Sequence, residues 1–266
     1  MAVNDSKPAQ PSTPAPDEPK AAAASGPRRR RVLAGGAAMA GIAAAGAAAV
    51  HLLRGERPVG PTADPTAAPP AAEGSFPDLR GDEELVAACR WAAQHHIQDG
   101  LPDGTYGAER AVTRSDVALS LHAFAGAPAV PVDTLPALVA DLPEKSDRAR
   151  ALLWLHGRGA LWGDEHLRVS PTVTATRADG ATIIASLLRP GLIALGTHLD
   201  AANTDTEALP RRERDHVSSA DVLWLLAAGV LRKADLSQWV SDAPLTRGEL
   251  ARLLRRTQSL LERSVD

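Results

Sequence analysis

Three arginines stand at the same place in a recurring short motif, and they carry the clearest chemical potential in the chain. The motif is Thr-Arg-x-acid, and its arginines are Arg114, Arg177 and Arg247. A guanidinium group beside the free N–H groups of a helix N-terminus forms a fork that suits a carboxylate or a phosphate. The same arginine can instead form a salt bridge with an acid of a neighbouring repeat. The motif therefore indicates an anion-binding groove, an internal ion pair, or a groove that contains both.

The threonine and the acid of each motif have a local explanation, because together they form a helix capping box. Threonine at the N-cap accepts a hydrogen bond from the backbone N–H three residues on, and the acid at that position accepts one from the backbone N–H of the threonine. The residues concerned are Thr113, Asp116, Thr176, Asp179, Thr246 and Glu249. The arginine between them is not explained by capping, since a cation in the first helical turn opposes the helix dipole.

A tryptophan precedes each motif threonine by 22 positions, which predicts a threefold internal repeat. Trp91, Trp154 and Trp224 hold this register, although the chain contains only five tryptophans. An alanine recurs 27 positions after each tryptophan, and a small residue at a fixed place on a helix predicts close helix–helix approach. The motifs are separated by 63 and then 70 residues, so the extra length is assigned to the connection at residues 199–217.

Each repeat is predicted to contain a helix, a loop and a second helix that begins at the motif. Asp82 is the predicted N-cap of the first helix in repeat one, and Ser146 is that of the first helix in repeat two. Ser218 and Asp221 are predicted to form a capping box at the first helix of repeat three. Pro190 is predicted to end the second helix of the middle repeat. Aromatic residues make up only 3% of a chain rich in Leu and Ala, which favours an all-α fold.

The N-terminal part of the chain is predicted to direct export. Residues 1–31 form a disordered, basic segment, and residues 54–75 form a Pro/Ala-rich linker. Between them, residues 32–53 are apolar, follow four arginines and are long enough to span a bilayer. This stretch is either a cleaved signal peptide of the twin-arginine type or a membrane anchor with its N-terminus in the cytoplasm. Both alternatives place the rest of the chain outside the cytoplasm, associated with the cell envelope.

The first repeat resembles the S-layer homology (SLH) family in three places. These are the opening Phe76-Pro77-Asp78, the run IQDGLPDGTY from Ile97 to Tyr106, and the Thr-Arg-Ser-Asp motif that follows. The second and third repeats keep the motif but depart from the family in their loops. The three repeats are predicted at residues 76–128, 140–198 and 205–266.

The resemblance implies three tandem helix-loop-helix repeats that form a three-lobed, pseudo-threefold spindle. SLH modules attach proteins non-covalently to cell-wall polysaccharide, often to a secondary polymer that bears a pyruvate ketal. The family's groove arginine corresponds to Arg114, Arg177 and Arg247, and the resemblance adds Trp91 and Asp78 as candidate ligand-binding residues. It implies a monomeric module without catalytic residues, cofactor or metal.

Two other function classes remain open. One is an envelope scaffold that binds a protein partner, with the repeats as a frame. The other is a cell-wall glycan hydrolase that uses Asp or Glu, but the chain has no nucleophile elbow, Gly-rich phosphate loop or His-Glu-x-x-His pattern. His95 and His96 with Asp99 are predicted to lie at one helix end. The sequence places no further metal ligand beside them, so no metal site is predicted. A formal net charge of -3 gives no reason to expect nucleic-acid binding.

The last predicted helix carries four arginines near its end. They are Arg252, Arg255, Arg256 and Arg263. We expect them to line a solvated helix face, and contact with anionic wall polymer or lipid headgroups is the alternative.

Overall fold

The regular elements in the described part of the chain are all helices. The computed structural model describes residues 76–130, 141–142, 146–161, 163–164, 166–199 and 206–264, which fall within one compact unit. The predictions for residues 1–31, 32–53 and 54–75 lie outside them. No helix of the described part is long and apolar enough to cross a membrane.

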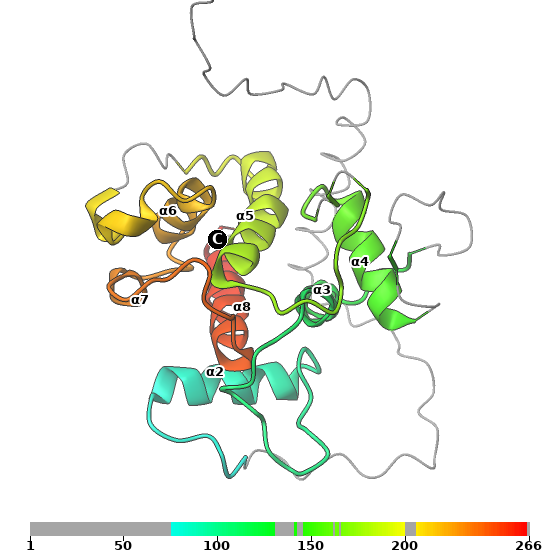
Figure 1. Cartoon of the computed structure of the whole chain (residues 1–266). Coiled ribbons are helices and arrows are strands. Elements are labelled where there is room, and N and C mark those ends of the chain that lie inside the picture. Colours follow the sequence, from blue (N-terminus) through cyan, green and yellow to red (C-terminus); the bar gives the residue numbers. More distant parts are fainter. Residues whose placement is uncertain are drawn as a thin grey trace, which may run out of the picture. The chain divides into compact units, whose positions relative to one another are not determined.

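Seven α-helices follow one another along these residues, and they contain no strand (Figure 1). The helices are α2 (Glu83–Gln94), α3 (Arg114–Phe124), α4 (Asp147–Gly157), α5 (Arg177–Ala194), α6 (Ser219–Ala227), α7 (Lys233–Leu236) and α8 (Arg247–Arg263). Two 3-10 turns, Thr206–Ala208 and Arg211–Glu213, precede α6. The all-α prediction is confirmed for the described residues.

The helices α3, α5 and α8 begin at the three motifs, each with a complete capping box. In α3 the hydroxyl of Thr113 accepts a hydrogen bond from the backbone N–H of Asp116 at 3.2 Å, and the Asp116 carboxylate accepts one from the Thr113 N–H at 2.9 Å. The same reciprocal bonds start α5 and α8. Asp82 caps α2 and Ser146 caps α4 through their side chains, so these predictions are confirmed.

The predicted capping box at Ser218 and Asp221 is wrong. The backbone at Ser218 is already helical, with φ -87° and ψ -2°, so its hydroxyl makes no bond to the helix start. It bonds Nδ1 of His216 at 2.8 Å instead. Asp221 is drawn to the preceding helix, where its carboxylate accepts a hydrogen bond from Arg189 at 2.9 Å. A hydrogen bond to the nearby His216 and an ion pair with Arg189 have replaced the capping box.

The prediction that Pro190 ends its helix is also wrong, because α5 continues to Ala194. Proline removes one backbone donor and normally breaks a helix interior. Here the continuation is favoured by burial of Leu192, one turn after the buried Leu188. The C-cap of α5 is Leu195, and the next residue is Gly196, whose φ of +79° suits glycine.

Each helix that begins at a motif packs against the first helix of the next repeat. The packed pairs are α3 with α4, α5 with α6, and α8 with α2. In Figure 1, α8 near the C-terminus lies against α2, the first described helix. The last element therefore returns to the first, and no repeat holds its own two helices as its main pair.

Backbone hydrogen bonds close a ring through the residues just before the three motifs. The N–H of Val112 donates to the carbonyl of Leu245 at 3.0 Å, that of Leu245 to Ala175 at 2.9 Å, and that of Ala175 to Val112 at 2.9 Å. The N–H groups of Arg114, Arg177 and Arg247 make a second cyclic set of bonds at 3.0, 2.9 and 2.9 Å, each to the segment before the next motif. Corresponding positions in the three repeats thus have corresponding partners.

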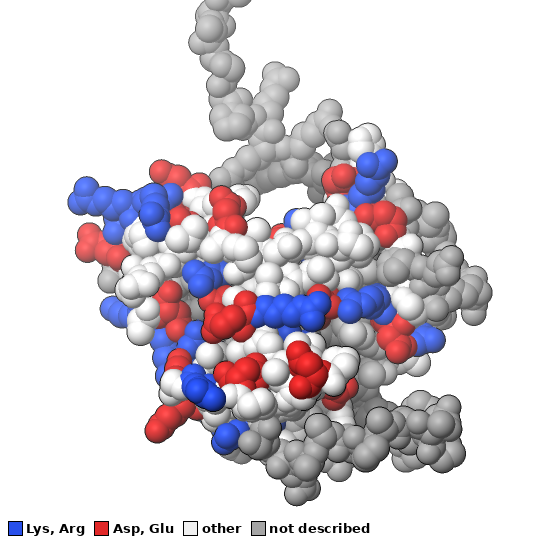
Figure 2. Space-filling view, turned by 60° about the horizontal axis from the view of Figure 1, so that its bottom comes forward, with Lys and Arg blue, Asp and Glu red and all other residues white. Residues whose placement is uncertain are grey.

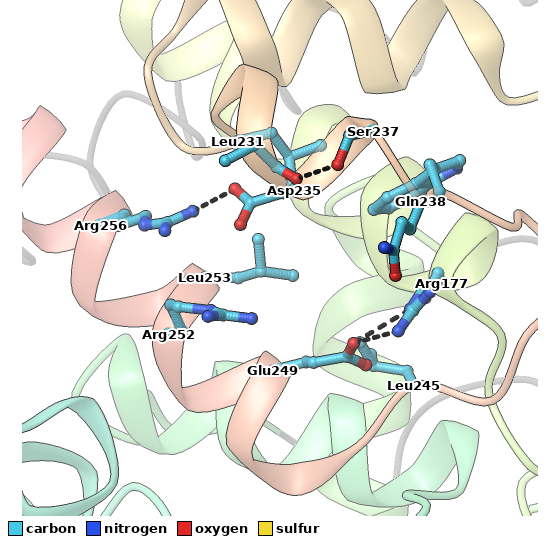
Figure 3. Close-up of a pocket in the computed structure, with 12 residues that line it drawn as sticks. Arg177, Leu231, Asp235, Ser237, Gln238, Leu245, Glu249, Arg252, Leu253 and Arg256 are labelled. Atoms are coloured by element: carbon cyan, nitrogen blue, oxygen red, sulfur yellow. Dashed lines mark hydrogen bonds and ion pairs between the residues drawn. The ribbon is translucent and has the colours of Figure 1, made fainter. Parts of the chain in front are cut away.

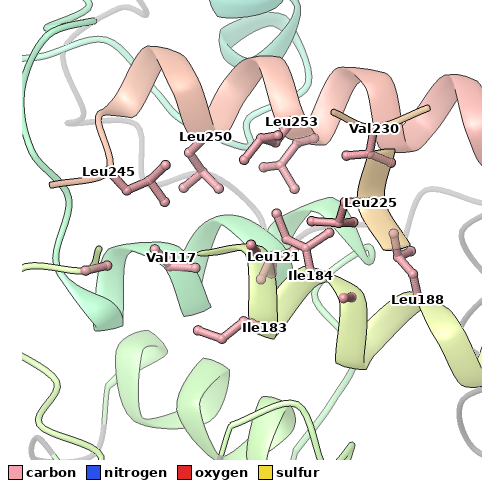
Figure 4. Close-up of a cluster of buried hydrophobic side chains, with 14 of the residues drawn as sticks. Val117, Leu121, Ile183, Ile184, Leu188, Leu225, Val230, Leu245, Leu250 and Leu253 are labelled. Atoms are coloured by element: carbon pink, nitrogen blue, oxygen red, sulfur yellow. The ribbon is translucent and has the colours of Figure 1, made fainter. Parts of the chain in front are cut away.

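The hydrophobic core lies where the motif helices meet. Figure 4 shows Leu250 of α8 facing Val117 and Leu121 of α3, beside Ile184 of α5. The alanines at the fixed place in these helices, Ala118, Ala181 and Ala251, are almost completely buried. Their burial agrees with the close approach that the repeat pattern predicts.

Gly248 occupies the variable motif position at a tight contact, so replacing it with alanine is expected to destabilise the fold. An added Cβ would lie 2.9 Å from Cδ1 of Leu85 and 3.2 Å from the carbonyl oxygen of Ala108. Overpacking of this kind costs about 1–3 kcal/mol. At Gly157, on the exposed end of α4, an added Cβ would have no neighbouring atom within 4 Å. Alanine there should raise the free energy of unfolding by about 0.5 kcal/mol. Urea unfolding of G248A and G157A should give opposite signs; equal effects would contradict the tight contact.

Candidate functional site

The side chain of Asp78 holds the loop of the first repeat by its backbone. Its two carboxylate oxygens accept hydrogen bonds from the N–H groups of Tyr106 at 2.9 Å and Gly107 at 2.7 Å. Burial raises the pKa of Asp78, and these backbone donors lower it by more, so the pKa lies below its ordinary value of 3.8. Asp78, a candidate ligand-binding residue, is therefore placed as a residue that positions the loop.

Asp141 makes the equivalent contacts in the second repeat and was missed in the sequence. Its carboxylate accepts hydrogen bonds from Val169 and Ser170, both at 2.8 Å. Asp141 stands 63 positions after Asp78, which is the interval between the first two motifs. The repeat register could have identified it. In the third repeat the buried Glu213 takes a similar part, with its carboxylate accepting from the N–H of Ser241 at 3.0 Å.

Two of the three motif arginines form ion pairs with the acid of the next motif. Nη2 of Arg114 lies 3.0 Å from the Asp179 carboxylate. Arg177 donates to the Glu249 carboxylate through both Nε, at 3.0 Å, and Nη2. The prediction of a salt bridge to a neighbouring repeat is confirmed at these two junctions.

The third arginine, Arg247, has different partners because Arg148 has taken its acid. Nη1 of Arg148 lies 2.6 Å from the Asp116 carboxylate. Arg247 instead donates to the carbonyl oxygens of Tyr106 at 3.1 Å and Asp99 at 2.6 Å. Its guanidinium lies over the Tyr106 ring, 5.0 Å from the centroid. Within the part of the chain that the structure describes, Arg247 forms no ion pair with a carboxylate, so its charge is met only by carbonyl dipoles and a ring face.

A hollow of about 440 Å³ opens beside Arg177, which we call the Arg177 hollow. Its lining comes from the start of α5, from α7 with the loop after it, and from α8. The residues are Arg177, Leu231, Ala234, Asp235, Ser237, Gln238, Trp239, Leu245, Glu249, Arg252, Leu253 and Arg256. Figure 3 shows the Arg177–Glu249 pair on one side and the Arg256–Asp235 pair on the other, with Leu253 and Arg252 between them.

The chemistry of the Arg177 hollow suits a ligand with both polar and apolar surface. Trp239 and three leucines give apolar wall, while Gln238 and the arginines give hydrogen-bond donors. Its volume is within the range usual for small-molecule sites, about 300–1,000 Å³. Sugar residues that carry a carboxylate combine these properties.

The tryptophans of the repeat register lie in the helix packing. Trp91 is half-buried on α2, with its ring 6.2 Å from Phe124 of α3 and 5.3 Å from His95. Trp154 and Trp224 are buried at the matching places of α4 and α6. Trp91 is not part of the Arg177 hollow, and the motif arginines lie at three separate junctions. The structure therefore does not bring the predicted ligand-binding residues together in one site.

The prediction that the four arginines near the end of the chain line a solvated helix face is wrong for Arg256 and Arg252, whereas Arg263 is exposed. The Arg256 side chain is only 8% exposed and donates to both oxygens of Glu84, at 2.8 and 2.9 Å, and to Asp235. Arg252 lies 2.9 Å from Asp82. The pKa of Glu84 lies below its ordinary value, and the hydrogen bond from Arg256 is the largest cause. These ion pairs connect α8 to the start of α2.

Charges of both signs are interleaved on the surface. On the face in Figure 2, basic side chains lie directly beside acidic ones, so that face offers no continuous basic area. Among the described residues, no group of three His, Cys, Asp or Glu side chains is placed to hold a metal ion. His96 contacts Asp99 at 3.1 Å in an exposed pair.

Replacement of Asp116 by asparagine is expected to destabilise the fold by about 1 kcal/mol at neutral pH, since it weakens a capping box and the contact with Arg148. Burial raises the pKa of Asp116, and hydrogen bonds from Thr113 and Arg148 lower it by more, to below 3.8. A carboxylate with a lowered folded pKa stabilises the fold above its unfolded pKa, and this contribution is lost as the pH falls through the folded pKa.

Wild type and D116N should therefore differ in urea unfolding at pH 7 and converge in acid. Glu109 is exposed, and E109Q serves as the control with little effect at either pH. A difference between wild type and D116N that persists unchanged in acid would contradict this role of the carboxylate.

Neither a scan against protein-family models nor a search of curated proteins finds a match. The chain's motifs and its described geometry are therefore the evidence on its function.

Proposed function

We propose that the chain is a non-catalytic, extracytoplasmic module that binds anionic polysaccharide of the cell envelope. Its three SLH-like repeats, at residues 76–128, 140–198 and 205–266, form a three-lobed, pseudo-threefold spindle. Export or membrane anchoring is assigned to residues 32–53. The proposal joins the motif resemblance to the closed ring of backbone hydrogen bonds and to the packing of each motif helix on the next repeat.

The observation that carries the proposal is the Arg177 hollow at a junction between repeats. Arg177 comes from the second motif, Glu249 from the third, and Trp239 from the loop between them. Glu249 occupies Nε and Nη2 of Arg177, and Nη1 makes no hydrogen bond with the described residues. A ligand carboxylate can therefore bind Nη1 while the internal ion pair stays intact, which makes the groove and ion-pair readings of the motif compatible.

Arg247 supplies a second contact for an anionic polymer. Its positive charge has no carboxylate partner among the described residues, and its side chain contacts the first-repeat loop, which best matches the family, at Asp99 and Tyr106. A carboxylate gains most from a cation that is not already neutralised, because the charge-assisted bond then replaces a weaker neutral one. Arg247 and Arg177 are therefore the proposed ligand contacts, and Arg114 is mainly structural.

Sedimentation with isolated wall sacculi tests the proposal. The full chain in mild detergent should pellet with sacculi, and the triple variant R114Q/R177Q/R247Q should stay in solution. Among the single variants, R177Q and R247Q should each weaken pelleting about tenfold, which corresponds to loss of one charge-assisted contact. R114Q is the matched control with retained pelleting. Absence of pelleting by the unaltered chain with any wall fraction would refute the proposal.

An envelope scaffold for a protein partner is the second candidate. It is favoured by the ion pairs of Arg114 and Arg177, because arginines committed to internal acids act as parts of a frame. Crosslinking in cells separates the two functions: a single protein adduct without glycan supports the scaffold, and a glycan adduct supports the wall module. Release of new reducing ends from sacculi would support the third class, a glycan hydrolase.

A further inference from the structure

A second hollow, of about 490 Å³, lies between α2, α8 and the segment after α6, and we call it the α8 hollow. Its lining is Glu84, Ala87, Ala88, Gly229, Arg232, Arg252, Arg255, Arg256, Ser259 and Arg263. The residues from α8 follow one another at steps of one, three or four, so they project from one side of the helix. None of the Thr-Arg-x-acid motifs contributes a residue.

Small side chains explain why this space is open. Ala87 and Ala88 of α2 and Ser259 of α8 contribute short side chains to the lining, and Gly229 follows the end of α6 with a φ of +75°. A Cβ at Gly229 would meet Nη2 of Arg263 at 3.9 Å. The lining thus combines short residues with long arginine side chains.

The α8 hollow has more positive than negative charge. Five of its ten lining residues are arginines, and Glu84 is the one acid. Glu84 is shared by Arg256 and Arg232, and Arg252 is paired with Asp82. Among the described residues, Arg255 and Arg263 form no hydrogen bond or ion pair, so the charges of these two arginines are not compensated there.

We propose that the α8 hollow binds a phosphate group. Two guanidinium groups without carboxylate partners match the charge of a phosphate monoester, about -1.5 to -2 at pH 7, and their planar forks match its oxygens. Arg232 and Ser259 lie in the same lining and can donate further hydrogen bonds. The α8 hollow contains neither Arg177 nor Arg247, although Arg252 and Arg256 line both hollows. Its phosphate comes either from a soluble phosphate or from a lipid headgroup such as that of phosphatidic acid.

Titration of the full chain with inorganic phosphate tests this site. Arginine side-chain NMR signals should shift in a saturable way, and the double variant R255Q/R263Q should bind about tenfold more weakly or not at all. Arg90 and Arg211 are exposed and line none of the described hollows, so R90Q/R211Q is a control with the same change in net charge. Circular dichroism checks that both variants are folded.

Vesicles of phosphatidylcholine with and without phosphatidic acid identify the source of the phosphate. Stronger binding to phosphatidic acid vesicles that is lost in R255Q/R263Q assigns a lipid headgroup; phosphate binding without this difference assigns a soluble phosphate. No saturable response to phosphate, or an equal response in R255Q/R263Q, would overturn the proposal. R255Q/R263Q should still pellet with sacculi, so failure of this site and failure of the wall-binding function are distinguishable.

Discussion

Replacement of Arg256 by alanine is expected to lower the free energy of unfolding by about 3–5 kcal/mol, the cost of breaking a buried ion pair from one side. The guanidinium is buried and donates to Glu84, to Asp235 and to the carbonyl of Val230. Without it, two carboxylates lie close together with less compensation. Urea unfolding of the full chain at pH 7 measures the effect.

Arg255 provides the matched control for this change. It is the preceding residue on the same helix, is partly exposed and has no partner among the described residues. R255A should change the free energy of unfolding by less than about 0.5 kcal/mol. Equal effects of R256A and R255A would show that the network between α8 and α2 does not stabilise the fold.

Replacement of Leu250 by alanine is expected to cost about 2–5 kcal/mol and to weaken all three repeats together. Leu250 is fully buried where α8 meets the other motif helices (Figure 4). The helix pairs join different repeats, so loss of packing on α8 is transmitted to α2 and α3. A single unfolding transition at lower urea concentration is the predicted result.

Hydrogen exchange gives the more detailed measurement of this coupling. Amides of α2, α3 and α5 should lose protection in L250A along with those of α8. Leu167 is 49% exposed, and L167A should leave both the transition and the protection pattern unchanged. Loss of protection confined to α8 would contradict a ring of interdependent repeats.

Local sequence chemistry was sufficient to predict where most helices begin. Thr113, Thr176 and Thr246 cap their helices through bonds to residues three positions away, so the motif contains both partners. The recurring alanines likewise predicted buried contacts correctly. At Ser218 the local signal failed, because Asp221 gained a stronger partner in Arg189 of another helix.

The candidate site was harder to predict because its partners are distant in sequence. Glu84 and Arg256 are 172 residues apart, and no local sequence pattern around either residue predicts the other as its partner. The three motif arginines are alike in sequence, yet Arg247 differs from the other two in its partners. The cause is Arg148, which binds the acid that Arg247 would otherwise meet. Such competition between two cations for one carboxylate can be seen only in three dimensions.

We propose that the chain binds an anionic wall polysaccharide through Arg177 and Arg247. The most direct measurement is a calorimetric titration of the full chain with the purified polymer, before and after its carboxylate groups are removed. We expect saturable binding that weakens with salt, requires the carboxylates and is lost in R177Q/R247Q but kept in R114Q. No saturable heat, or equal binding by wild type and R177Q/R247Q, would contradict it.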